Sequence, residues 1–226
     1  LGEPRISCSL CLMKNLCVEK MELGPIATNA FLLWEENGDG SAVLIDAPPF
    51  ARERVQEILD HKNLNLRAIW LTHGHWDHMG GVADFDISEL EIIGHRDDQI
   101  MFEQPGIMST FAIPGLELKP VQITQWVEHG DTLDLWGREV EIRHCPGHCP
   151  GNVIFWIKED SSCFVGDVIF AGSVGRSDLP GGDFETLERS IRNSIYSLPE
   201  DTKLHPGHGE DTEVGREKIS NPFVHS

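Results

Sequence analysis

A stretch of ten residues that begins at Thr72, THGHWDHMGG, constrains this chain more than any other part of the sequence. It holds four side chains that can bind a metal ion: His73, His75, Asp77 and His78. An apolar run of strand character, RAIWL, comes directly before it, so the ligands stand on a turn where a strand ends. Alternate side chains of an extended segment share a face, so His73 and His75 can bind one ion, while Asp77 and His78 face a second.

This HxHxDH pattern resembles the signature of the metallo-β-lactamase superfamily. The resemblance implies an α/β fold, the four-layer αβ/βα sandwich, with the metal site at one edge between two sheets. It also implies further ligands downstream. His148 lies in the turn CPGHCPG and His208 in HPGHG, while Asp167 interrupts the apolar run FVGDVIF. A carboxylate inside an apolar run is costly unless it is paired or bound to a metal.

The ligand assignment is carried over from the resemblance, position by position. It places His73, His75 and His148 on a first metal ion, Asp77, His78 and His208 on a second, and Asp167 as the bridge between them. We expect Asp77 and Asp167 to act in catalysis as well. The ions are expected to be two divalent cations, zinc first, although iron or manganese would suit the same ligands.

Three more residues near these motifs have weaker signals. Asp46 matches a frequent aspartate of the family and would orient the histidine ligands, although an ordinary turn residue is the alternative. His144 is expected to support the site at most. His205 fits poorly, because the family pattern places the ligand after Pro-Gly.

Within the superfamily, the complete ligand set is similar to that of the glyoxalase II (hydroxyacylglutathione hydrolase) branch. Residues 171–182, AGSVGRSDLPGG, and residues 206–223 look like the short single-domain members of bacteria. The implied substrate is a small thioester, and the implied mechanism is attack on its acyl carbon by a hydroxide held between the two ions.

Two departures make glutathione a doubtful carrier. Only 18 residues follow His208, so we expect no helical C-terminal domain of the kind that helps full-length glyoxalase II to bind glutathione. The final histidine of the family motif HTPGHTPGH is Asn152 here. We therefore expect slow turnover of S-lactoylglutathione. Arg176 is the one cation that we name as a possible partner for a glutathione carboxylate.

Other chemistries remain open on the same ligands. Mononuclear iron persulfide dioxygenases share the motifs but use two histidines and one aspartate, which would be His73, His148 and Asp167. A promiscuous metallo-hydrolase with weak β-lactamase activity is a further alternative. A purely structural metal site is disfavoured, because structural zinc sites are closed by four ligands and seven are present here.

The net charge limits the classes of binding partner, and the cysteine content indicates the cellular compartment. The formal net charge of −19 argues against nucleic acid and against anionic membrane surfaces. No apolar run is long enough to span a membrane. The six cysteines are not needed as a disulfide framework in a chain of 226 residues, so we expect free thiols and a cytoplasmic location. The sequence does not fix the oligomeric state.

The rest of the sequence predicts a single domain. We expect residues 1–16 to form a tail and residues 17–226 to form the metal-binding domain. Apolar patterns predict strands at residues 18–23, 30–34, 42–45, 67–71, 91–93, 121–127, 132–136, 139–144, 152–157, 162–165 and 203–204. Helical spacing predicts helices at residues 52–61, 95–102 and 185–198, and residues 211–213 are expected to cap a final helix that runs to about residue 219.

Overall fold

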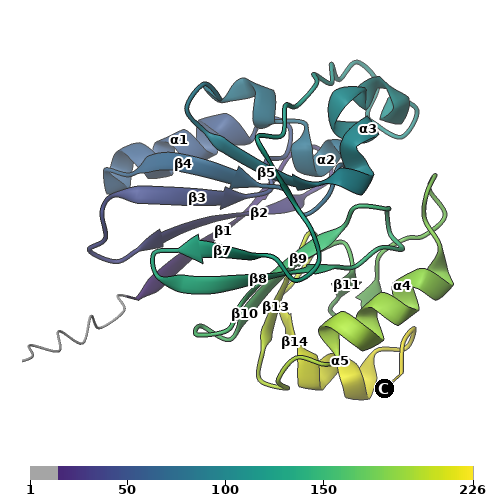
Figure 1. The fold of residues 1–226 in the computed structure, drawn as a ribbon. Helices are drawn as coiled ribbons and strands as arrows, with labels where there is room; N and C mark the ends of the chain where they lie inside the picture. Colours follow the sequence, from purple (N-terminus) through teal and green to yellow (C-terminus); the bar gives the residue numbers. More distant parts are fainter. Residues whose placement is uncertain (1–14, 226) are drawn as a thin grey trace, which may run out of the picture.

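The computed structural model describes residues 15–225. Two six-stranded sheets pack face to face, and helices cover the outer face of each (Figure 1). The predicted four-layer αβ/βα sandwich is therefore confirmed. The predicted tail, residues 1–16, lies almost entirely outside the described residues, and so do Cys8 and Cys11.

The first sheet has its strands in chain order. It contains β1 (Leu16–Leu23), β2 (Thr28–Glu35), β3 (Ser41–Ile45), β4 (Asn65–Trp70), β5 (Glu91–His95) and β6 (Gln125–Val127). The first three form the antiparallel meander expected from their turn signals. The later strands pair in parallel, and α1 (Ala51–Lys62) makes the crossover from β3 to β4. The short helices α2 (Trp76–Met79) and α3 (Gln99–Glu103) follow on the same side (Figure 1).

The second sheet has the order β14-β13-β10-β9-β8-β7. Its strands are β7 (Thr132–Leu135), β8 (Arg138–His144), β9 (Val153–Ile157), β10 (Ser162–Gly166), β13 (Lys203–Pro206) and β14 (Thr212–Glu213). A small ribbon, β11 (Ile169–Phe170) and β12 (Ser173–Val174), follows β10. Helices α4 (Phe184–Ser190) and α5 (Val214–Ser220) cover the outer face (Figure 1).

The centre of the molecule is the apolar layer between the two sheets. Phe31 of the first sheet meets Phe164 of the second with ring centroids 5.1 Å apart, and Trp70 meets Phe155 at 5.4 Å. Every side chain of β9 is buried, because the opposite face of that strand packs under the outer helices. This explains why β9 reads as a continuous apolar run rather than an alternating one.

Strand direction decides where the ligand-bearing turns meet. Strand β9 is antiparallel to both β8 and β10, and β10 is parallel to β13, so β8, β10 and β13 all run the same way. Their carboxyl ends therefore lie at one edge of the second sheet, and each is followed by a candidate ligand: His148, Asp167 or His208.

Three predicted elements differ from the structure. Residues 95–102 do not form one helix, because His95 ends β5 and a 3-10 turn, Arg96–Asp98, precedes α3. The alternating pattern at residues 121–127 yields a strand only at Gln125–Val127. The preceding Val121 and Ile123 instead belong to the apolar cluster that includes Phe102 of α3. The helix at residues 185–198 is α4 followed by a π-helical turn, Ile191–Ile195.

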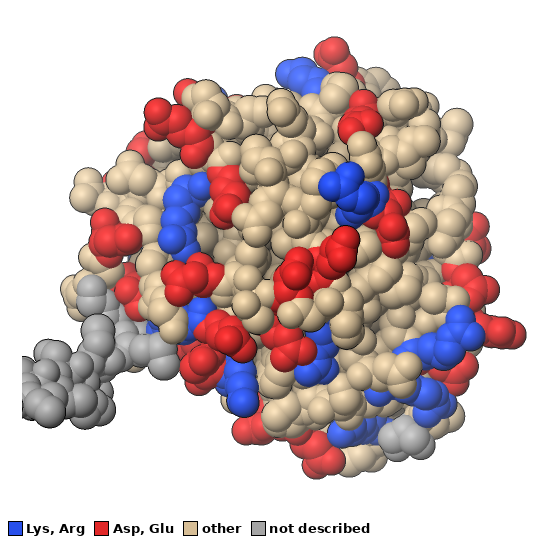
Figure 2. All heavy atoms as spheres, in the orientation of Figure 1, with Lys and Arg blue, Asp and Glu red and all other residues tan. Residues whose placement is uncertain are grey.

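The four cysteines in the described part, Cys17, Cys145, Cys149 and Cys163, are free thiols, as expected. Within residues 15–225, no helix is long and apolar enough to cross a membrane. Acidic and basic side chains are interspersed over the face shown in Figure 2.

Candidate metal centre

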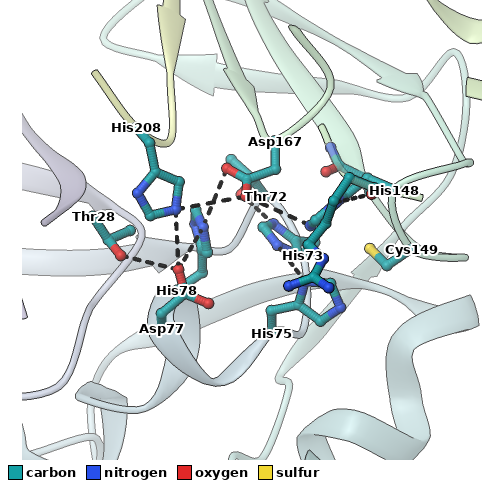
Figure 3. A network of polar contacts seen from close by, with 12 residues as sticks. Thr28, Thr72, His73, His75, Asp77, His78, His148, Cys149, Asp167 and His208 are labelled. Carbon is teal, nitrogen blue, oxygen red and sulfur yellow. Dashed lines mark hydrogen bonds and ion pairs between the residues drawn. The ribbon is translucent and has the colours of Figure 1, made fainter. Parts of the chain in front are cut away.

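The seven predicted ligands converge at the edge where the two sheets open. His73 and His75 follow β4, Asp77 and His78 belong to α2, and the other three follow strands of the second sheet. Figure 3 shows their side chains pointing toward one another, with Asp167 between two groups. Each sheet thus contributes to the centre through turns that leave the carboxyl ends of its strands.

The first group is the triad His73, His75 and His148. One nitrogen of each imidazole lies within 4.8 Å of the others. His73 Nε2 and His75 Nδ1 are 3.1 Å apart. The His148 Nδ1–H donates to the carbonyl oxygen of Arg176 at 2.7 Å, which leaves Nε2 facing the centre.

The second group is Asp77, His78 and His208, whose ligand atoms also lie within 4.8 Å of one another. Asp77 Oδ2 is 3.2 Å from Nε2 of His78 and 3.2 Å from Nε2 of His208. His208 is held in place by its backbone, which forms an isolated antiparallel bridge with Thr28 at the start of β2.

Asp167 faces both groups at once. Its Oδ2 is 3.5 Å from His148 Nε2 in the first group and 3.6 Å from His208 Nε2 in the second. Its Oδ1 is 3.4 Å from His78 Nε2. This is the position that a carboxylate needs in order to bridge two ions.

Several buried nitrogen and oxygen atoms of the centre lack hydrogen-bond partners in the described part of the chain and are suited to bind metal ions. Three buried atoms that point inward, His78 Nε2, His148 Nε2 and Asp167 Oδ1, have no hydrogen-bond partner within the described residues, although buried polar atoms are ordinarily satisfied. Two ligands of one tetrahedral zinc ion lie about 3.3 Å apart, given metal–ligand bonds of about 2.0–2.1 Å. The His73–His75 separation of 3.1 Å in the first group and the two Asp77–histidine separations of 3.2 Å in the second match that geometry.

Comparison with known proteins agrees with this centre. The family model described as the metallo-beta-lactamase superfamily matches residues 23–208. The chain belongs to the metallo-beta-lactamase superfamily. It is 36% identical over 213 residues to "Hydroxyacylglutathione hydrolase GloC" of Haemophilus influenzae, a match that covers 92% of this chain and 98% of that protein.

Two solved structures are also similar to this chain. The crystal structure of the BLEG-1 B3 metallo-beta-lactamase has a TM-score of 0.84 at 33% identity and covers 93% of this chain and 100% of that one. The structure of TTHA1623 in a di-iron-bound form has a TM-score of 0.80 at 37% identity and covers 92% and 100%. Family membership and the His/Asp clusters together make this chain a metal-dependent hydrolase that binds divalent ions.

The protonation of the centre suits a superfamily metal site. Burial alone would raise the pKa of Asp167, but the surrounding imidazoles, led by His78, outweigh it and bring the pKa to about 2. Burial and the neighbouring His148 lower the pKa of His75 to about 3. The carboxylate is therefore charged and the His75 imidazole neutral at neutral pH, which are the forms that bind metals. At His78 burial favours the neutral form, but the carboxylates of Asp77, Asp167 and Asp46 outweigh burial and raise the pKa, so an ion that binds there displaces a proton.

Asp46 has the supporting role that the sequence suggested. Its Oδ2 accepts from Nδ1 of His78 and from the Thr72 hydroxyl, both at 2.8 Å, and its Oδ1 accepts from the Thr72 backbone N–H at 2.8 Å. The proton on His78 Nδ1 leaves Nε2 with its lone pair toward the centre. Asp46 itself has a positive φ of 58°, a conformation that is uncommon outside glycine and that often marks functional sites.

Asp98 is a supporting residue that the sequence analysis missed. Its carboxylate is fully buried and accepts from the backbone N–H of Gly74 at 2.8 Å and of Gly151 at 2.6 Å. The Cys149 thiol donates to it at 3.3 Å. Asp98 therefore ties the loop that carries His73 and His75 to the loop that carries His148. Nothing around Asp98 in the sequence signals this, because its partners are backbone groups of distant loops.

Thr28 and Gly207 also support the ligands; Gly207 belongs to the Pro-Gly-His turn seen in the sequence, whereas Thr28 has no sequence signal. The Thr28 hydroxyl donates to Asp77 Oδ2 at 3.0 Å and orients that carboxylate. Gly207 precedes His208, and a Cβ atom there would collide with Asp167 Oδ1 and with the His78 ring. The Pro-Gly-His order thus has a steric reason, since only glycine lets this turn pass so close to the ligands.

The remaining predicted residues lie outside the ligand groups. His144 Nε2 donates to the Pro150 carbonyl oxygen at 2.6 Å across the loop that carries His148, so it supports the site indirectly. The His205 ring stacks on Phe164, and its Nδ1 lies 3.0 Å from Asp211, which agrees with its exclusion from the ligands.

Proposed function

We propose that this protein is a dinuclear metallo-hydrolase that cleaves thioesters. The observation that carries the proposal is the placement of Asp167, whose carboxylate lies within 3.6 Å of an imidazole of each ligand group. A site for one ion has no use for a carboxylate placed between two complete sets of ligands. Similarity to a hydroxyacylglutathione hydrolase supports the thioester class.

In this proposal His73, His75 and His148 would hold a first ion, Asp77, His78 and His208 would hold a second, and Asp167 would contribute to both sites. Such ions would lower the pKa of a bound water and polarise the acyl oxygen of the substrate. The donor atoms are all nitrogen and oxygen, which suits zinc first and also iron or manganese.

The protein's own residues orient the metal ligands and fix which ring nitrogen of each histidine carries the proton. Asp46 fixes the tautomer of His78, and the Arg176 carbonyl fixes that of His148. Asp98 holds the two ligand-bearing loops together, and Thr28 orients the Asp77 carboxylate. Because these supports are set before substrate binds, the ligands need no rearrangement during the reaction.

Glutathione has little support as the thiol carrier. Arg176 borders the site, but its Nε and Nη2 donate to the two carboxylate oxygens of Asp178, both at 2.8 Å. This exposed bidentate pair competes for the cation that the sequence analysis names as a partner for glutathione. We therefore expect S-lactoylglutathione to be hydrolysed slowly.

The test combines metal analysis with a thioester assay. Protein purified without chelator should contain close to two equivalents of metal, and removal of both ions should abolish thioester hydrolysis until metal is restored. One equivalent of iron, together with oxygen consumption on glutathione persulfide, would instead favour the dioxygenase. Two bound ions with turnover of a β-lactam but no thioester would favour the β-lactamase alternative.

A further inference from the structure

A large cavity opens directly onto the ligands. Its volume is about 990 Å³, and His75, Asp77, His148, Asp167 and His208 form its floor. Sites for small molecules typically occupy about 300–1,000 Å³, so this cavity is at the upper end of that range. A two- or three-carbon acyl group would leave most of it unfilled.

The walls of the cavity are apolar on both sides of the ligands. On the side of the first group, Ile100, Met101, Ile107 and Phe111 line it, and Met101 packs close to Gly74 in the His73–His75 loop. On the other side Ile26 and Phe170 line it, and the Phe170 ring lies 6.1 Å from that of His208. A substrate held over the ions therefore meets apolar surface in either orientation.

Exposed apolar side chains are concentrated around this cavity. Within residues 15–225, nine large apolar side chains are substantially exposed, and four of them border this cavity: Ile26, Ile100, Ile107 and Phe111, at 45–54% exposure. Scattered single apolar residues are normal on a surface, but a group around one opening marks a binding site.

Charge at the cavity does not favour an anionic substrate. Apart from the ligands, its charged lining residues in the described part are Asp97 and Arg176, and Arg176 is paired with Asp178. Glutathione brings two carboxylates and one ammonium group, and the only arginine or lysine among the described lining residues that could receive the two carboxylates is Arg176, for which Asp178 competes. An uncharged thiol part needs no such partner.

We infer that the substrate is a thioester with an apolar acyl chain and an uncharged thiol part. This rests on the proposed function. In the reaction the acyl carbon–sulfur bond breaks and water supplies the new carbon–oxygen bond. The products are a carboxylate, a free thiol and one released proton. The apolar walls bind the acyl chain and so contribute to catalytic specificity from a part of the substrate that does not react.

The experiment measures kcat/KM of the metal-loaded enzyme for straight-chain acyl thioesters of N-acetylcysteamine, from acetyl to decanoyl, with S-lactoylglutathione as reference. Each added methylene should raise kcat/KM about fourfold until the cavity is filled, as burial of a methylene predicts. Phe111→Ala should flatten this dependence. Phe223→Ala is the matched control, because Phe223 is similarly exposed, at 51%, but does not line the cavity, so it should leave the dependence intact.

A second variant tests the effect of charge at the cavity. Asp178→Asn releases Arg176 from its pair and should raise kcat/KM for S-lactoylglutathione several-fold, with little effect on the uncharged series. A flat chain-length profile, or a preference for the glutathione thioester of more than tenfold, would overturn this inference and leave the thioesterase proposal standing.

A failure of the proposed function has a different signature. No hydrolysis of any thioester with both ions bound would reject the thioesterase proposal itself. Binding of non-cleavable ketone analogues, in which a methylene replaces the sulfur, then tests the cavity alone. Affinity that rises with chain length in the wild type and not in Phe111→Ala would support an apolar-chain site, and equal affinity for all lengths would overturn it.

Discussion

The two ligand groups are supported in different ways. The first group is enclosed: His73, His75 and His148 are at most 7% exposed, and Asp98 clamps their two loops together from a distant turn. Both groups border the cavity, but the second is more exposed, because the His208 side chain is 27% exposed. Its support comes from the first sheet, through Asp46 after β3 and Thr28 in β2.

This difference teaches that one centre can have two separable affinities. The hydrogen bonds of Asp98 reach only the loops of the first group. Asp46 bonds directly to His78 but also reaches the first group through Thr72, whose hydroxyl lies 3.0 Å from His73 Nδ1, and the His73 and His78 rings lie 4.0 Å apart. Loss of a support should therefore weaken one ion more than the other, whereas loss of Asp167 should weaken both. Four substitutions test that comparison.

Asp167→Ala should have the largest effect, because this carboxylate faces both groups. The fold should survive, but metal content should fall at both sites and kcat/KM should drop by about 10³-fold or more, since the ions supply several kcal/mol of stabilisation to the reacting acyl group. Elemental analysis, circular dichroism and a thioester assay check this. Full activity with normal metal content would show that the bridging assignment is wrong.

The sequence was sufficient for the ligands because each stands in a local pattern. The HxHxDH run, the two Pro-Gly-His turns and a carboxylate in an apolar run are all visible within a few residues. The supports Asp98 and Thr28 are invisible for the opposite reason, since their partners lie 24 to 53 residues away and include backbone atoms.

The same distinction applies to the fold. Strands with strong apolar runs, such as β9, and the amphipathic α1 were predicted well. Residues 121–124 and 95–98 were predicted poorly. Side chains there pack against neighbouring elements, but the backbone does not form the predicted strand or helix. Tertiary packing overrides local pattern most easily in short segments.

Asp46→Asn should weaken the second ion by about 10- to 100-fold, the range measured for groups that orient metal ligands. The amide keeps the size of the side chain and tolerates the positive φ, but its NH₂ group faces His78 Nδ1. His78 then carries its proton on Nε2, which blocks the lone pair that points to the ion. Anomalous occupancies at the two sites in crystals of the variant measure the effect. Equal loss at both sites would contradict the separation drawn here.

Asp98→Asn should weaken the first ion about tenfold and leave the second unchanged. Both carboxylate oxygens accept from backbone N–H groups, so an amide must place a donor against Gly74 or Gly151. The two loops would then move apart and carry His148 away from His73 and His75. Asp97→Asn is the control, because Asp97 belongs to the same turn but its side chain is 55% exposed. Chelator competition should show lower affinity in Asp98→Asn only.

Thr28→Val should have the smallest effect and sharpens the comparison most. Valine keeps the size and branching of threonine, so the change removes only the hydroxyl that donates to Asp77 Oδ2. Asp77 would still be held by the ion and by its place in α2, so the second ion should weaken only about three- to tenfold, at or below the usual loss of one hydrogen bond to a charged group. Thr28→Ser retains the hydroxyl and should bind both ions as the wild type does. Chelator competition on the three proteins resolves the two affinities, and a first ion weakened as much as the second in Thr28→Val would contradict the separate support of the two groups.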